Sequence, residues 1–167
     1  EAFGVSEIIN LSNASRVQFG SPELQVNATL MNAAQTKAED MAKKRYFSHY
    51  SPDGTSPWNF INDSGYVYAV AGENLAITNE SAESVIRGWL SSPSHRENLL
   101  SKDYADFGMG MARYGDYEGH KDTTVIVALY AKVGSPLVVT GAEPTNPAGT
   151  IAALKPKLLT FSPEIIF

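Results

Sequence analysis

The chain has 167 residues, a formal net charge of −5, 43% apolar residues and no cysteine. This length suits one soluble globular domain with its own core, and the negative charge argues against a nucleic-acid-binding surface. The lack of cysteine excludes disulfides, thiolate metal sites and a cysteine nucleophile, and no apolar run in the sequence approaches the roughly 20 residues of a membrane span. Because the first residue is Glu1 rather than Met, we expect a processed or trimmed product from which any signal peptide is already gone.

The first part of the chain is predicted to be helical. A short amphipathic helix is expected over residues 5–18, with these side chains at helical spacing: Val5, Ile8, Ile9, Ser12 and Val17. A longer helix is expected over 28–45 with Asn27 as its N-cap. Its buried side should consist of Leu30, Ala33, Ala34, Lys37, Ala38 and Met41.

The middle of the chain alternates loops with shorter elements. Residues 48–58 have loop composition, and Ser56 followed by Pro57 predicts the start of a short helix that ends at Gly65. Residues 65–71 form a short strand candidate, and the segment with Glu73 is expected to be a loop. A helix over 82–90 is interrupted by Pro93 and followed by a further turn.

The remaining pattern before residue 134 is typical of strands. Residues 106–112 alternate large side chains with small ones, and we expect Gly108 and Gly110 to allow a helix to pack closely on a sheet. Residues 123–133 are β-branched and aromatic, which favours a buried strand. The polar segment 115–122, which contains His120, is expected to be a flexible hairpin loop. Helices followed by a small antiparallel sheet predict an α+β fold.

The composition changes after residue 134. Residues 135–167 hold five of the nine prolines and only four charged side chains. We therefore predict one domain over residues 1–134 and a proline-containing tail or linker over 135–167, with a short helix around 148–155.

Three polar residues stand out as candidate site residues: His49, Glu73 and His95. If the helix over 28–45, the Glu73 segment and the helix around Trp89 pack on one sheet, the three side chains converge in a cleft. Two imidazoles and a carboxylate can bind a divalent metal, and a histidine beside an acid can act as a general base. The spacing equally allows all three to hold loop backbone in place. The serines near His95 lack the strained elbow of a hydrolase nucleophile and are better explained by helix capping.

Four segments, taken in order, resemble the CAP superfamily (cysteine-rich secretory proteins, antigen 5 and pathogenesis-related class 1 proteins, also called SCP-like extracellular proteins). They are "LMNAAQTKAEDMAKKRYFSHYSPDGTSPW", "GYVYAVAGENLA", "VIRGWLSSPSHRENLL" and "VIVALYAKV". The resemblance covers about residues 5–134 and is greatest to the cysteine-free bacterial branch. It implies a three-layer α-β-α sandwich with a small antiparallel sheet, and a protein that is extracellular or displayed on the cell surface.

The resemblance also implies a cleft in which two histidines and two glutamates can hold a divalent cation such as zinc. His49, Glu73 and His95 match three of these positions, but the position of the second glutamate is Ser92. His49 and His95 are thus the candidate metal ligands, and no other cofactor is indicated.

Three functions are compatible with these residues. We expect a binding domain for a small molecule, lipid, peptide or cell-wall component, because the sequence has no convincing nucleophile. A hydrolase of peptides or peptidoglycan that uses His49, Glu73 and His95, with or without a metal, is the first alternative. A surface adhesion or signalling module is the second.

Overall fold

The computed structural model describes residues 3–134 and 164–165. The helices and strands, in chain order, are α1 (Val5–Gln18), β1 (Gln25–Val26), α2 (Ala28–Lys44), α3 (Pro57–Asp63), β2 (Tyr68–Thr78), α4 (Ala82–Ser91), α5 (Pro93–Leu100), β3 (Asp106–Tyr117), β4 (His120–Val133) and β5 (Glu164–Ile165). In this part of the chain no helix is long and apolar enough to cross a membrane. The helix expected around 148–155 falls outside the described residues.

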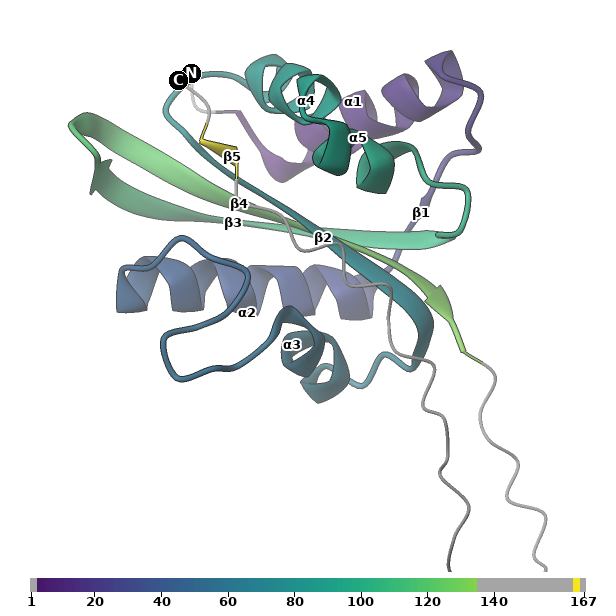
Figure 1. Cartoon of the computed structure of the whole chain (residues 1–167), viewed down its shortest axis with the longest axis horizontal. Helices are drawn as coiled ribbons and strands as arrows, with labels where there is room; N and C mark the ends of the chain where they lie inside the picture. The colour runs from purple at the N-terminus through teal and green to yellow at the C-terminus, as the bar shows by residue number, and fades with distance from the viewer. Residues whose placement is uncertain (1–2, 135–163, 166–167) are drawn as a thin grey trace, which may run out of the picture.

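The fold is a sheet between two helical layers, which confirms the predicted α-β-α sandwich. The strand order is β1-β3-β4-β2-β5, with β4 antiparallel to both β3 and β2. The short strands β1 and β5 add to the two edges in parallel orientation. Helices α2 and α3 cover one face of the sheet, and α1, α4 and α5 cover the other (Figure 1).

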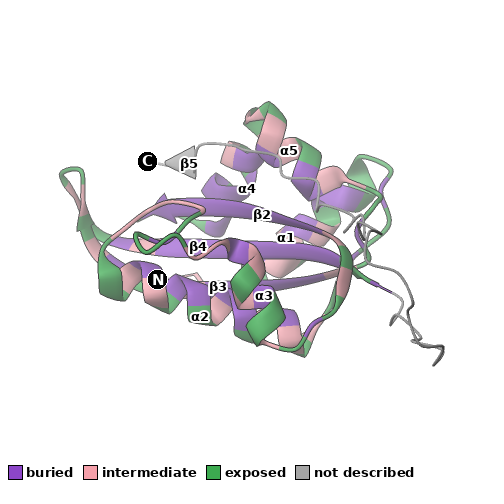
Figure 2. Ribbon diagram, turned by 60° about the horizontal axis from the view of Figure 1, so that its bottom comes forward, coloured by how far each residue is buried: buried purple, intermediate pink, exposed green. Residues whose placement is uncertain are grey.

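Each face of the sheet has its own apolar core. Under α1, α4 and α5 the core includes Ile8, Val85, Trp89, Phe107 and Tyr130. Under α2 and α3 it includes Leu30, Met41, Ile61, Leu75 and Leu129. The central strands β2 and β4 are therefore buried along much of their length (Figure 2).

The two long helices lie where the sequence predicts them. The Asn27 side chain accepts hydrogen bonds from the backbone N–H groups of Thr29 and Leu30, at 2.9 and 3.2 Å, and so caps α2. The buried side of α2 is the predicted one, Lys37 included. Helix α1 is present as predicted, although Val17, one of the residues at helical spacing, is 57% exposed. The buried positions of α1 are Ile8, Ser12, Ser15 and Arg16, whose spacing leaves Val17 turned toward solvent.

The glycines of β3 allow α2 to pack closely on the sheet, as predicted. A Cβ atom on Gly108 would lie 2.1 Å from the carbonyl carbon of Leu30, and one on Gly110 would lie 2.3 Å from that of Ala34. Both contacts would be with helix backbone, which cannot rotate away as a side chain can. The position of α2 above the sheet therefore depends on these two glycines.

The β3–β4 hairpin is longer than the sequence indicates, and its tip projects beyond the helices (Figure 1). The predicted flexible loop over 115–122 was wrong, because most of this segment continues the two strands and His120 begins β4. The chain reverses at Glu118 and Gly119, whose φ angles are 47° and 86°, the left-handed values that a tight hairpin turn requires. Backbone pairing holds these residues in strands although many of their polar side chains face water.

Strand β2 also differs from the prediction. A short strand followed by a loop was expected, but one strand of 11 residues runs through both and contains Glu73 and Asn74. Both residues pair with β4, Glu73 opposite Leu129 and Asn74 opposite Ala128. The Glu73 segment is thus rigid sheet, not loop.

Candidate functional site

Strand β2 directs two neighbouring polar side chains into different layers. Successive residues of a strand face opposite sides of the sheet. Glu73 accordingly points to the α2 layer, where it contacts Lys37, and Asn74 points to the α5 layer, where it contacts the backbone of His95. The candidate site is therefore built around β2, with helical elements contributing from both sides.

A buried ion pair joins Glu73 to Lys37. The Lys37 Nζ atom lies 2.8 Å from Glu73 Oε2 and 3.0 Å from Oε1, and the exposed fractions of the two side chains are 0% and 1%. The same ammonium donates to the backbone oxygen of His49 at 2.5 Å. Burial lowers the pKa of Lys37 from its usual value, and the neighbouring carboxylate of Glu73 opposes this shift.

His49 is held against the same carboxylate. Its Nδ1 atom lies 2.6 Å from Glu73 Oε1, and its side chain is 15% exposed. A carboxylate accepts hydrogen bonds, so Nδ1 carries the proton and donates it to Glu73. The other ring nitrogen, Nε2, is buried and has no hydrogen-bond partner among the described residues. His49 therefore has one nitrogen fixed by the protein and one that a bound molecule can use.

His95 reaches this region from α5. Its Nδ1 atom lies 2.8 Å from Ser92 Oγ. Burial, followed by the charge of His49, lowers the pKa of His95 to about 4. The imidazole is thus neutral near pH 7, and its Nδ1 shares a hydrogen bond with the Ser92 hydroxyl. Of the three predicted site residues, His49 and Glu73 are in direct contact, and His95 lies close enough to His49 to be affected by its charge.

An amide network fixes β2 beneath these residues. The Asn98 side chain donates to the backbone oxygen of Glu73 at 3.0 Å and to Asn74 Oδ1 at 3.1 Å, and it accepts from the Tyr104 hydroxyl at 3.1 Å. Asn74 donates to the backbone oxygen of His95 at 2.9 Å, which shows that it braces backbone. Helix α5 is thereby bonded to the strand that carries Glu73.

Sequence reasoning placed Lys37 on the buried side of α2 but did not assign it to the site. The available signal was its type, because a lysine on a buried helical face requires a partner for its charge. Asn98 and Tyr104 were also missed. Asn98 lies in the segment "VIRGWLSSPSHRENLL", but the resemblance assigned it no role, and no motif marks Tyr104. The role of both residues depends on how α5 packs against β2.

The donor set does not fit the divalent cation that the family resemblance implies. In the described residues no three His, Asp or Glu side chains form a group that could hold a metal ion. Both oxygens of Glu73 face the Lys37 ammonium, and Ser92 contributes a hydroxyl where a second carboxylate was expected. The predicted metal role of His49 and His95 consequently gains no support from this arrangement.

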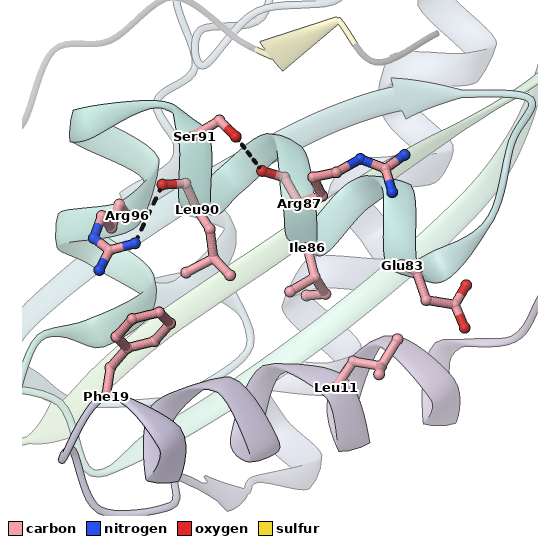
Figure 3. A pocket seen from close by; sticks show the side chains of 8 residues that line it. All are labelled: Leu11, Phe19, Glu83, Ile86, Arg87, Leu90, Ser91 and Arg96. Carbon is pink, nitrogen blue, oxygen red and sulfur yellow. Dashed lines mark hydrogen bonds between the residues drawn. The ribbon is translucent and has the colours of Figure 1, made fainter.

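A second feature is a groove of about 410 Å³ between α1 and the α4–α5 pair (Figure 3). Leu11, Ile86 and Leu90 give it apolar walls, and the Arg96 guanidinium lies 4.4 Å from the centre of the Phe19 ring at one end. Arg87 and Glu83 lie toward the other end. No sequence motif marks this groove, because its walls come from helices far apart in the chain.

Solved structures share this fold, and one of them is of a protein with an SCP domain. An extracellular protein containing an SCP domain from Bacillus anthracis aligns with a TM-score of 0.65 and 26% identity, over 76% of this chain and 39% of that one. An outer surface protein from Borrelia burgdorferi aligns with a TM-score of 0.68 and 22% identity, over 80% of this chain and 98% of that one. The second likeness is one of fold alone.

The chain belongs to the cysteine-rich secretory protein (CAP) family, whose model matches residues 9–130. It is 36% identical over 109 residues to the uncharacterized protein YkwD of Bacillus subtilis, covering 65% of this chain and 42% of that protein. It is 33% identical over 107 residues to the uncharacterized membrane protein YlbC of the same organism, covering 64% and 31%. The chain thus spans less than half the length of these relatives.

Proposed function

We propose that this chain is a non-enzymatic binding domain whose ligand contacts His49 at the edge of β2. The observation that carries the proposal is the state of the two ring nitrogens. Glu73 fixes Nδ1 at 2.6 Å, and Nε2 remains buried without a hydrogen-bond partner among the described residues. Buried polar atoms are nearly always hydrogen-bonded, so an exception in a partly open site indicates a group that a ligand satisfies.

The orientation of His49 suggests what kind of group it binds. Because Glu73 occupies Nδ1, Nε2 is the ring nitrogen left to a ligand, and it can bond a hydroxyl or an amide, groups that both donate and accept hydrogen bonds. Peptides, cell-wall fragments and small polar molecules all carry such groups. We further propose that the protein acts outside the cell or at its surface, on the strength of its family and of the extracellular SCP-domain protein that shares its fold.

Calorimetric titration with peptides and peptidoglycan fragments tests this proposal. His49→Ala should weaken the binding of a true ligand at least about tenfold, the equivalent of one lost hydrogen bond to a buried group. His120→Ala, in the projecting hairpin, is the matched control and should leave affinity unchanged. Equal affinity of the wild type and His49→Ala for every ligand found would remove His49 from the binding site.

The groove between α1 and α4–α5 supports a lipid as a second candidate ligand. Its apolar walls suit an acyl chain, and Arg87 and Arg96 supply cationic groups for an acidic head. Leu90→Asp should abolish binding of a fluorescent fatty acid there, whereas His49→Ala should not. The reverse pattern would place the lipid at His49, and binding that neither variant reduces would exclude both sites.

A hydrolase remains the enzymatic alternative, and one observation favours it. A histidine whose Nδ1 is bonded to a buried carboxylate has the arrangement of a general base, with Nε2 positioned to accept a proton from water or substrate. Peptide or peptidoglycan turnover by the wild type that falls at least about a hundredfold in Glu73→Gln would support this alternative. An absence of turnover across a broad panel, with or without added zinc, would eliminate it.

A further inference from the structure

We infer that the ammonium group of Lys37 takes the place of a divalent metal ion beside Glu73, so that the site works without one. This inference rests on the proposed function, since it concerns the same His49–Glu73 site. It adds the positioning residue that organises the site and the charge that the site offers to a ligand.

The first argument is the coordination of the ammonium. Lys37 Nζ has contacts of 2.5 Å to the backbone oxygen of His49, 3.0 Å to Glu73 Oε1 and 2.8 Å to Glu73 Oε2. The ammonium donates hydrogen bonds to the His49 oxygen and to Glu73 Oε1, whereas Glu73 Oε2 lies at ion-pair distance without a hydrogen bond. The group therefore links the His49 loop to β2 from the interior, as a bound cation would.

The second argument is the charge of the donor set. The carboxylate of Glu73 is neutralised by Lys37 inside a fully buried pair. On the other side, Ser92 and His95 contribute a hydroxyl and an imidazole and no carboxylate. A divalent ion would therefore meet no net negative charge, and it would be repelled by an ammonium about 3 Å from the carboxylate that has to bind it.

The third argument concerns the ligand. Because the Lys37–Glu73 pair carries no net charge, the site gives no strong preference to a cationic molecule. The buried His49 Nε2, which has no hydrogen-bond partner among the described residues, is then free to bond uncharged hydroxyl or amide groups, in agreement with the ligand class proposed above.

Zinc and cobalt titrations test the inference. Calorimetry with Zn²⁺ and the visible absorption of added Co²⁺ should show equally weak metal binding by the wild type and by His49→Ala. This result would mean that no metal binds at His49. Lys37→Met should create binding that His49→Ala abolishes, at least about tenfold tighter than in the wild type, because the repelling charge is gone. Lys44→Met is the matched control, a partly exposed lysine of the same helix, and it should change nothing.

Two results would overturn the inference. One is stoichiometric zinc binding by the wild type that His49→Ala abolishes. The other is a folded Lys37 variant that gains no metal affinity; Lys37→Gln, which keeps a hydrogen-bond donor, serves if Lys37→Met does not fold. Neither measurement uses the organic ligand, so a failed ligand screen and a failed metal prediction are separate outcomes.

Discussion

Lys37→Met should destabilise the protein far more than any exposed lysine substitution, and most of that loss should disappear when Glu73 is also neutralised. Methionine has nearly the length of lysine but no charge, so the substitution leaves the volume of the α2–sheet interface almost unchanged. It removes the ammonium from beside both oxygens of Glu73, leaving Oε1 only its bond to the His49 ring, and it deprives the backbone oxygen of His49 of its donor.

The size of the effect follows from burial and distance. Two opposite charges about 3.5 Å apart attract by about 5 kcal/mol at an effective dielectric constant of 20. Leaving one charge of a buried pair uncompensated costs about 3–5 kcal/mol, and Lys37 and Glu73 are 0% and 1% exposed. Glu73→Gln should cost about 3 kcal/mol by the same reasoning. The double variant should lose about 2–3 kcal/mol less than the sum of the two single losses.

Urea unfolding of the wild type, both single variants and the double variant gives this coupling directly. Lys44→Met is the control, because Lys44 is 42% exposed and its pairs with Asp40 and Asp53 lie near the surface; it should change the free energy of unfolding little. A loss from Lys37→Met no larger than that from Lys44→Met, or two single losses that simply add, would refute the reasoning.

Three other substitutions probe the frame around the site. The pKa of His95 is about 4 in the folded protein and about 6.5 in the unfolded chain, so the unfolded chain binds more protons between these two pH values. The free energy of unfolding should therefore fall by roughly 3 kcal/mol as the pH drops from 6.5 to 4. Urea unfolding at several pH values should show this slope for the wild type and a flatter one for His95→Asn. Arg16→Met should lower the free energy of unfolding by about 3–5 kcal/mol. The buried guanidinium of Arg16 donates to the backbone oxygens of Pro22, Leu99 and Ser101 at 2.7–2.9 Å, and all three would lose this donor. A loss below about 1 kcal/mol would contradict this reasoning. Gly108→Ala should lower the free energy of unfolding by about 3 kcal/mol or more, because its Cβ would lie 2.1 Å from the carbonyl carbon of Leu30. Gly4→Ala is the control: a Cβ there would meet open space, and the substitution should cost less than about 1 kcal/mol in the same thermal or urea unfolding assay.

Local pattern was sufficient for the helices and for the α+β class, and the three-layer architecture came only from the family resemblance. The spacing along α2 identified its buried side, and the alternation around Gly108 and Gly110 identified where a helix lies against the sheet. Both patterns recur every few residues within one short stretch of chain, so they can be recognised in a single sequence without knowledge of distant contacts. The family resemblance then indicated the order of the layers.

Strand limits and the site contacts were harder to predict. Residues 115–122 have the composition of a loop, yet they pair as strands because their partner is close in the chain and their side chains can face water. The Lys37–Glu73 pair joins residues 36 positions apart, and the Asn98–Glu73 bond joins residues 25 apart. Such contacts exist only once two layers have packed on β2, so residue types can suggest a missing partner but cannot name it.

The opposite directions of Glu73 and Asn74 have a consequence for how this chain can evolve. Inserting or deleting one residue just before them in β2 would exchange the two side chains between the layers, placing the acid against Asn98 and the amide against Lys37. A point substitution does not change which layer each side chain faces. Related sequences should therefore differ in residue type over residues 70–78 but keep the same number of residues there. The irregular pairing between Tyr68 and Val70 is the one place in the paired part of β2 where the register already shifts, and length changes should be confined to it.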